Sequence, residues 1–246
     1  MSKMKVDIWS DVRCPFCYIG KRKFETALAT FPNKGEVEVV WHSFELDPTL
    51  KTDTDKSVYD YLAERKGMSR EVSVQMHNQL VQAAKEVGLD YYFDKAVVAN
   101  SFNAHRLIQL AKTKGLGDEA EERLFRAYYT EGRNIDDLNT LTQLGVEVGL
   151  SAIEVGEMLY SNAFAEEVRR DQAQAQAMNI TGVPFFVINE RYGISGAQPP
   201  QIFSQALEKA WNEYAEENSS KELATANGAS CGIDGKCYEP SQELIQ

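Results

Sequence analysis

The stretch that decides the fold is SDVRCPFCYIGKRKFE, residues 10–25, in which two cysteines stand two residues apart where the sequence pattern changes. Before it, residues 5–11 alternate apolar and polar side chains as a β-strand does. After Cys14, apolar residues recur at three-, four- or five-residue steps, which favours a helix. Alternation returns in residues 36–46. The chain is therefore predicted to open as strand, helix, strand, the start of a βαβ unit.

The two cysteines are predicted to be a redox pair. Cys14 falls at the N-terminus of the helix, where backbone N–H groups without intrahelical partners stabilise a negatively charged sulfur. Cys17 lies one turn later, close enough to form a disulfide with Cys14. Pro15 suits the first helical position, because its missing N–H is not needed there. Since the thiolate is the form that attacks disulfides, the pair is predicted to work through a mixed-disulfide intermediate.

Two other uses of the pair are less favoured by the sequence. A zinc knuckle needs two more ligands at similar spacing, and the remaining cysteines, Cys231 and Cys237, lie more than 200 residues away. Simple burial is disfavoured because the pair lies at a junction between loop and helix, beside Arg13 and Lys21. No metal and no cofactor are expected.

The rest of the sequence predicts a long helical insertion before the sheet is completed. Residues 57–176 show helical periodicity with no convincing strand, as in the stripe Val72, Met76, Leu80, Ala84 and Val87. Residues 185–188 form a short apolar run, turn residues follow, and Ile194 begins a return strand, which predicts a hairpin. Residues 199–217 then form an amphipathic helix with proline in its first turn.

These patterns predict an α/β protein of three parts. Residues 1–50 and 177–216 form one discontinuous domain, and residues 51–176 form an inserted α-helical domain. Residues 217–246, rich in Ser, Gly, Asn and Glu, form a flexible tail.

Composition excludes some partners. The formal net charge of −11 is spread along the chain, which disfavours nucleic acid and anionic membranes. The sequence shows no apolar stretch long enough for a signal peptide or a membrane span, so a cytoplasmic protein is expected. The three histidines, His42, His77 and His105, have no sequence-local partners that suggest a metal site or a catalytic triad.

At this point the sequence resembles a known family. The stretch WSDVRCPFCYIGKRKFE, a helical insertion and the later TGVPFFVIN resemble the DsbA-type branch of the thioredoxin superfamily, most closely its cytoplasmic FrnE-like members. The resemblance implies a thioredoxin fold with an inserted α-helical domain. It also implies a cis bond between Val183 and Pro184 beside the cysteines, with the Val183 backbone pairing with an extended substrate peptide. The implied partners are protein or peptide thiols and disulfides, with glutathione or a thioredoxin-type reductant.

One residue departs from the best-known periplasmic relatives, which carry histidine where this chain has Phe16. Phenylalanine neither donates a hydrogen bond to the Cys14 thiolate nor adds positive charge. The chain is therefore predicted to be a weaker oxidant than those relatives, with an intermediate or reducing dithiol. Phe16 is also assigned, with Val183 and Pro184, to the substrate-binding surface.

The tail contains a second cysteine pair in CGIDGKC, residues 231–237, whose glycines let the backbone curl. One hypothesis makes Cys231 and Cys237 a second redox centre that exchanges with Cys14 and Cys17, because an extended tail from Glu217 would reach roughly 46 to 50 Å. The alternatives are an exposed tail with a local disulfide or free thiols, and metal capture.

The leading functional prediction is a thiol-disulfide oxidoreductase or protein disulfide isomerase. A small-molecule isomerase or glutathione-dependent enzyme of secondary (polyketide) metabolism is the second, because kappa-class glutathione transferases and hydroxychromene carboxylate isomerases share the implied fold. Those enzymes carry serine at the first cysteine position, so the retention of Cys14 and Cys17 argues against their chemistry. A non-enzymatic peptide-binding or holdase module is the third.

Overall fold

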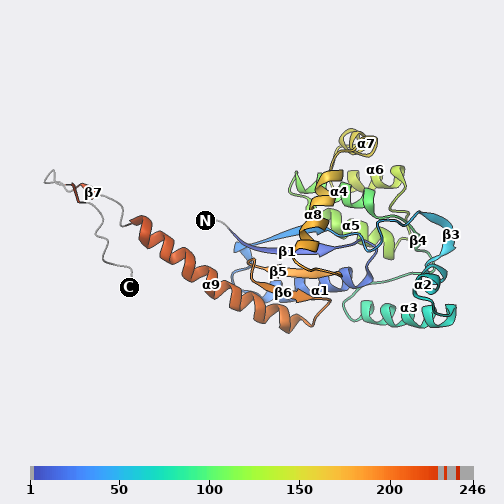
Figure 1. The fold of residues 1–246 in the computed structure, drawn as a ribbon, viewed down its shortest axis with the longest axis horizontal. Coiled ribbons are helices and arrows are strands. Elements are labelled where there is room, and N and C mark those ends of the chain that lie inside the picture. The colour runs from blue at the N-terminus through green and yellow to red at the C-terminus, as the bar shows by residue number, and fades with distance from the viewer. Residues whose placement is uncertain (1–2, 227–229, 232–236, 239–246) are drawn as a thin grey trace.

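In the computed structural model, which describes residues 3–226, 230–231 and 237–238, a central sheet adjoins a group of helices (Figure 1). The sheet has the order β2-β1-β5-β6, with strands β1 (Met4–Ser10), β2 (Val37–Ser43), β5 (Phe185–Ile188) and β6 (Tyr192–Ser195). Strand β1 pairs parallel with β2 and antiparallel with β5, which pairs antiparallel with β6. The predicted strand-helix-strand opening, the late hairpin and the thioredoxin fold are confirmed.

Each face of the sheet buries a different set of side chains. The helices that cover the two faces are α1 (Pro15–Thr30) and α9 (Pro200–Ala226) on one, and α8 (Ala165–Ala177) on the other (Figure 1). Phe186 of β5 packs against Phe24 of α1 and Phe203 of α9, with ring centroids 5.6 and 4.7 Å away. Trp9 packs on the opposite face with Ala175 of α8. Successive side chains of β1 point to opposite faces of the sheet, so their order along the strand decides which of them meet α1 and α9 and which meet α8.

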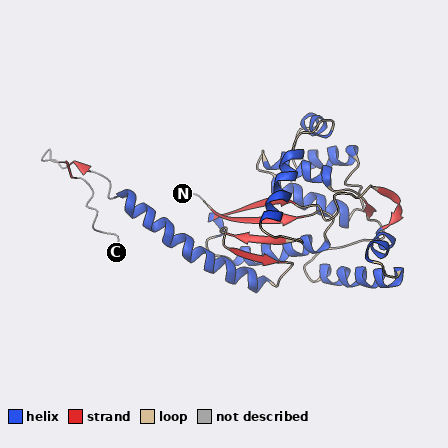
Figure 2. Cartoon of the chain, in the orientation of Figure 1, coloured by secondary structure: helices blue, strands red, loops and turns tan. Residues whose placement is uncertain are grey.

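The insertion between β2 and β5 contains a small sheet as well as helices. Its further elements are β3 (Asp53–Ser57), α2 (Val58–Lys66), α3 (Arg70–Lys85), β4 (Val97–Val98), α4 (Phe102–Lys112), α5 (Gly117–Tyr129), α6 (Leu138–Glu147) and α7 (Ala152–Leu159). The prediction that this segment contains no strand is wrong, because β3 and β4 pair antiparallel (Figure 2). Strand β3 reads Asp-Thr-Asp-Lys-Ser and is mostly exposed, so it lacks the apolar alternation that signals a strand. The predicted domain boundaries stay a prediction.

The last helix is longer than the sequence indicated. Helix α9 continues to Ala226, although the tail was predicted to begin at residue 217. Because a helix rises about 1.5 Å per residue, against about 3.3 Å in an extended chain, the reach predicted from Glu217 is too long. Beyond it, β7 (Ser230–Cys231) and β8 (Cys237–Tyr238) pair antiparallel with Cys231 opposite Cys237. Their side chains lie outside the described residues, so the second redox centre stays a prediction.

Among the helices that the structure describes, none is both long enough and apolar enough to cross a lipid bilayer.

Candidate active site

Cys14 lies where the loop after β1 becomes α1. It has extended backbone angles and is the N-cap of the helix, with Pro15 in the first turn. Its N–H donates to the carbonyl oxygen of Asp11 at 2.8 Å, and its own carbonyl oxygen accepts from the N–H of Cys17 at 3.0 Å. The predicted position of Cys14 at the positive end of the helix is therefore confirmed.

The two sulfurs differ in their surroundings. Both cysteines are reduced and buried, with Cys14 4% and Cys17 1% exposed. Burial raises the pKa of the Cys17 thiol well above its ordinary value, and the neighbouring Cys14 raises it further. Cys17 therefore stays protonated at neutral pH, so Cys14 is the better placed of the two to attack a disulfide from outside.

The segment before β5 completes the site from the other end of the chain. The peptide bond between Val183 and Pro184 is cis, as the resemblance implied. The Cys14 thiol donates to the carbonyl oxygen of Val183 with the sulfur 3.4 Å from the oxygen. On α1, Gly20 leaves room for Pro184, because a Cβ atom at Gly20 would lie 3.0 Å from the proline Cγ. The structure thus brings the predicted residues Cys14, Val183 and Pro184 together.

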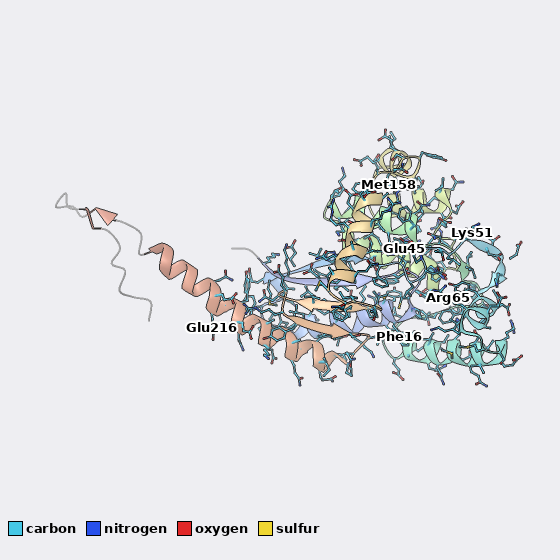
Figure 3. All side chains as sticks on the ribbon, viewed as in Figure 1. Phe16, Glu45, Lys51, Arg65, Met158 and Glu216 are labelled. Atoms are coloured by element: carbon cyan, nitrogen blue, oxygen red, sulfur yellow. The ribbon has the colours of Figure 1, made fainter. Side chains whose placement is uncertain are left out.

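Phe16 and a nearby cavity form the outer part of the site. The Phe16 side chain is 49% exposed and lies at the end of α1 near α3 (Figure 3). The hydroxyl of Tyr91 donates to the carbonyl oxygen of Pro15 at 2.7 Å, which ties the first turn of α1 to the insertion. Beside Pro15 lies a cavity of about 120 Å³ with a mainly aromatic and apolar lining that includes Phe93 and Tyr129.

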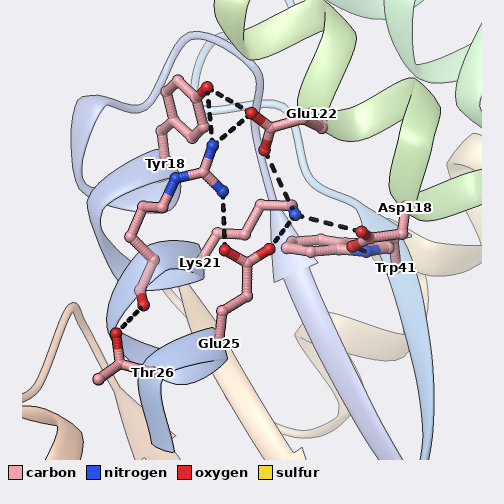
Figure 4. A network of polar contacts seen from close by, with 8 residues as sticks. Tyr18, Lys21, Glu25, Thr26, Trp41, Asp118 and Glu122 are labelled. Carbon is pink, nitrogen blue, oxygen red and sulfur yellow. Dashed lines mark hydrogen bonds and ion pairs between the residues drawn. The ribbon is translucent and has the colours of Figure 1, made fainter. Parts of the chain in front are cut away.

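A buried lysine joins α1 to the insertion, and the sequence did not single out its partners. Lys21 is 2% exposed, and its ammonium group forms ion pairs with Glu25, with Asp118 at 3.2 Å and with Glu122 at 3.3 Å (Figure 4). Glu122 also accepts a hydrogen bond from the hydroxyl of Tyr18 at 2.6 Å. Asp118 and Glu122 lie about 100 positions from Lys21 in the sequence, so periodicity could not show that they are its partners. The only sign of this ion-pair network in the sequence is a lysine among the mostly apolar residues on one side of a helix.

The histidines have partners that lie far away in the sequence. His105 is buried, with Nε2 3.6 Å from Oδ1 of Asp11, and Asp11 also accepts the N–H of Leu46 at 2.8 Å. Burial raises the pKa of Asp11, but the nearby His105 and Arg13 outweigh burial and leave the pKa below its ordinary value. His42 lies between Asp7 and Asp171. Within the described part of the chain, no cluster of His, Cys, Asp and Glu has the arrangement of a metal site.

A dithiol at a helix N-terminus, facing a cis-proline segment, defines a thiol-disulfide oxidoreductase fold of the DsbA type. The model of the DsbA-like thioredoxin domain matches residues 5–208, and the chain belongs to this family. A solved structure from Streptomyces coelicolor, described as a probable DsbA oxidoreductase, is 38% identical. It covers 97% of this chain and 100% of its own length, with a TM-score of 0.81.

Two more distant structures share the fold alone. The cytosolic disulfide reductase DsbM of Pseudomonas aeruginosa is 18% identical, with a TM-score of 0.60 over 85% of this chain and 98% of that one. It has also been solved with glutathione. A 2-hydroxychromene-2-carboxylate isomerase is 18% identical, with a TM-score of 0.61 over 88% of this chain and 98% of that one.

Proposed function

We propose that this chain catalyses thiol-disulfide exchange on protein or peptide substrates, with Cys14 as the nucleophile and Cys17 as the resolving thiol. The observation that carries the proposal is the placement of both thiols in the first turn of α1, with the Cys14 sulfur 3.4 Å from the carbonyl oxygen of Val183. This arrangement supports an attacking sulfur stabilised by the helix N-terminus, beside backbone that a substrate can pair with.

The exchange runs in two balanced steps. The Cys14 thiolate attacks one sulfur of a substrate disulfide, so that a Cys14–substrate disulfide forms and the other substrate sulfur leaves as a thiolate. Cys17 then loses its proton and attacks the Cys14 sulfur. A Cys14–Cys17 disulfide forms, the substrate leaves as a second thiolate, and both thiolates take protons from water. Two electrons have then passed from the enzyme dithiol to the substrate disulfide.

Three features of the site support a peptide as the substrate. The Val183 backbone next to Cys14 offers main-chain hydrogen bonding, which recognises an extended peptide with little regard to its sequence. The exposed ring of Phe16 gives an apolar contact beside the reacting sulfur. The cavity beside Pro15 is large enough for one apolar side chain of the substrate.

We infer a reducing or intermediate redox poise and a cytoplasmic, FrnE-like role. Phe16 cannot stabilise the Cys14 thiolate by hydrogen bonding, so the oxidised form is relatively favoured and the pair donates electrons more readily. The likeness in fold to a cytosolic disulfide reductase that has been solved with glutathione agrees with this direction. Glutathione or a thioredoxin-type protein would then supply the electrons.

The test is the reduction of insulin driven by glutathione, with wild-type protein compared with Cys14→Ser. The expected result is loss of catalysis to the uncatalysed rate in the variant, and equal rates would contradict the proposal. A Cys231→Ser/Cys237→Ser variant separates the second pair from the first. In Cys17→Ser protein, mass spectrometry of trapped disulfides should show Cys14 bonded to substrate. A bond from Cys14 to Cys231 or Cys237 would support the hypothesis that the tail pair is a second redox centre.

The second candidate is a glutathione-dependent isomerase of small molecules, favoured by the likeness in fold to the hydroxychromene carboxylate isomerase. Such an enzyme does not need a second thiol, so it should keep its activity in Cys17→Ser protein. A holdase would likewise suppress aggregation of an unfolded client in the Cys14→Ser variant. If insulin reduction were unchanged in Cys14→Ser, the redox proposal would be wrong. Isomerase activity kept in Cys17→Ser would then favour the isomerase, and suppression of aggregation kept in Cys14→Ser would favour the holdase.

A further inference from the structure

The cavity beside Pro15 contains one charged side chain. Arg13, the residue before Cys14, lines this cavity of about 120 Å³ and is the only charged group among the described residues that line it. His77 also lines it, but burial lowers the pKa of His77, and its Nδ1 lies 2.7 Å from the carbonyl oxygen of Ser73. His77 is therefore neutral at pH 7, and the cavity combines an apolar and aromatic surface with a single cation.

The guanidinium group of Arg13 has no carboxylate partner. It is half-buried, with its central carbon 5.3 Å from the centre of the Tyr61 ring on α2. Asp11 accepts the backbone N–H of Arg13 at 3.0 Å, but no carboxylate of the described residues lies within ion-pair distance of the guanidinium. Its Nε is buried and has no hydrogen-bond partner among these residues. Removing a cation from water without pairing it costs free energy, which a bound anion would offset.

Tyr129 of α5 supplies a second donor without an acceptor. Its side chain is 1% exposed and lines the same cavity, and within the described part of the chain its buried hydroxyl has no hydrogen-bond partner. Buried tyrosine hydroxyls usually find an acceptor. Tyr91, whose ring stacks on Tyr129 at 4.3 Å, does so by donating to the carbonyl oxygen of Pro15. The lining of this one cavity therefore includes two buried donors that lack acceptors.

We propose that the cavity binds the carboxylate of an acidic residue of the substrate peptide, through the guanidinium of Arg13 and the hydroxyl of Tyr129. A carboxylate only accepts hydrogen bonds, and its two oxygens match the donors of a guanidinium. The methylene groups of a glutamate would pack against apolar lining such as Phe93. The inference rests on the proposed function and adds a preference among its peptide substrates.

The position of the acidic residue follows from the extended form of the peptide. In an extended chain, side chains two positions apart point to the same side and lie about 7 Å from one another. The cavity lies beside Pro15, next to the sulfur that reacts with the substrate cysteine. The acidic residue is therefore expected two positions before or after that cysteine.

Two other roles for these residues make different predictions. An apolar side chain would fill the cavity but leave both donors unpaired, which forfeits their hydrogen bonds. Arg13 acting only on the charge of the Cys14 thiolate would speed the reaction of every peptide alike. The net charge of −11 disfavours acidic peptides in general, so a preference for them requires a local site.

The experiment compares peptides that differ only in this carboxylate. Each peptide carries one cysteine joined by a disulfide to a neutral 2-thiopyridyl group, and glutamate or glutamine two positions before or after the cysteine. Attack by the Cys14 thiolate forms the Cys14–peptide disulfide and releases 2-thiopyridone, which is followed by its absorbance. With reduced wild-type protein, the second-order rate constant should be about 10-fold higher for glutamate than for glutamine at one of the two positions.

Matched variants assign this preference to the cavity. Arg13→Met should abolish it, and Arg13→Lys, which keeps a positive charge, should restore part of it. Tyr129→Phe should reduce the preference, and it keeps the proposal testable if Arg13→Met does not fold, because it removes only an unpaired hydroxyl. Arg169→Met removes a 63% exposed positive charge on α8, so it should keep the wild-type preference.

Four outcomes would contradict these expectations. Equal wild-type rates for glutamate and glutamine at both positions would overturn the carboxylate site, as would a preference left unchanged by both Arg13→Met and Tyr129→Phe. Dependence on Arg13 confined to the thiopyridyl disulfide of glutathione, and absent from its diethyl ester, would overturn the assignment to a peptide. Release of 2-thiopyridone no faster in wild type than in Cys14→Ser would instead overturn the proposed function.

Discussion

The sulfur of Cys14 lies 3.4 Å from the carbonyl oxygen of Val183, a residue 169 positions further along the chain. The contact joins the first turn of α1 to the segment before β5, so the reactive thiol and the backbone beside it come from opposite ends of the insertion. In the proposed exchange, a substrate that pairs with this backbone would be held where Cys14 can attack. The chemistry of the pair then depends on what surrounds the sulfur.

Replacing Phe16 with histidine should make the dithiol more oxidising. A histidine there can donate a hydrogen bond to the Cys14 thiolate or add positive charge, which stabilises the reduced form. A tenfold change in the equilibrium constant corresponds to about 30 mV, and a rise of at least about that size is expected. The measurement is equilibration of the pair with glutathione buffers, followed by alkylation and mass spectrometry.

The control for this prediction is Phe16→Leu, which removes the ring and adds no hydrogen-bond donor. It should stay close to the wild-type potential. Equal shifts in the histidine and leucine variants would mean that loss of the aromatic contact, rather than stabilisation of the thiolate, sets the potential.

The features that could be predicted from sequence are those set by neighbours along the chain. The change of period after Cys14 indicated the strand and the helix, and the two-residue spacing placed Cys17 in the same helical turn. The stripe in α3 shows the limit of this approach. Its helix was correct, but Val72 and Met76 are exposed while Ser73 and His77 are buried. Ser73 can be buried because its hydroxyl donates to the carbonyl oxygen of Tyr59, at 2.8 Å.

What the sequence could not show is pairing between distant residues. Glu121 and Ser10 read as an ordinary surface glutamate and a strand-end serine, and only the packing of α5 on the sheet makes them neighbours. The same holds for His42, whose two carboxylate partners lie 35 and 129 residues away. Periodicity shows which side of a helix is apolar, and it carries no information on which other element packs against that helix.

A side chain at Gly20 should disturb the reactive site. A Cβ atom there would lie 3.0 Å from Cγ of Pro184 and 3.5 Å from Cζ of Phe186. Alanine in a helix normally stabilises by about 0.5 to 1 kcal/mol relative to glycine, so Gly156→Ala in α7, where nothing lies within 4 Å of the Cβ, should gain that amount in urea unfolding. Gly20→Ala should gain less and should slow insulin reduction. Equal stabilisation with full activity would show that Pro184 moves aside freely.

The contacts of His42 should make stability depend on pH. Its Nε2 lies 2.8 Å from Asp7 and its Nδ1 3.0 Å from Asp171. Burial lowers the pKa of His42, but the two carboxylates outweigh burial and raise the pKa above its ordinary value. The stabilisation that protonated His42 provides is therefore complete below about pH 6.5, the pKa of histidine in the unfolded chain. It is lost as pH rises through the higher pKa of His42 in the folded protein. The free energy of unfolding in urea should therefore fall across this range because of His42.

His42→Gln isolates this contribution, because His105 also has a raised pKa and shifts stability in the same direction. The variant should lose stability mainly at pH 6, so the difference between wild type and variant should shrink towards pH 9. A difference that stays constant from pH 6 to pH 9 would mean that packing of His42 against Trp9, whose rings stack at 4.4 Å, accounts for the loss.

Removal of the Lys21 charge should loosen the contact between α1 and α5. Burial lowers the pKa of Lys21, but its three carboxylate partners raise it above the ordinary value, so the lysine stays charged. Lys21→Met removes the ammonium group from Glu25, Asp118 and Glu122, of which Glu25 and Glu122 keep their ion pairs with Arg22. The expected loss is about 2 kcal/mol, below the usual 3 to 5 kcal/mol for a broken buried pair, because the carboxylates are 31 to 56% exposed. Lys114→Met breaks an exposed pair with Glu154 and should change stability by less than about 1 kcal/mol. If Lys21→Met and Lys114→Met lost the same free energy of unfolding in urea, the ion pairs of Lys21 would contribute no more than an ordinary surface ion pair.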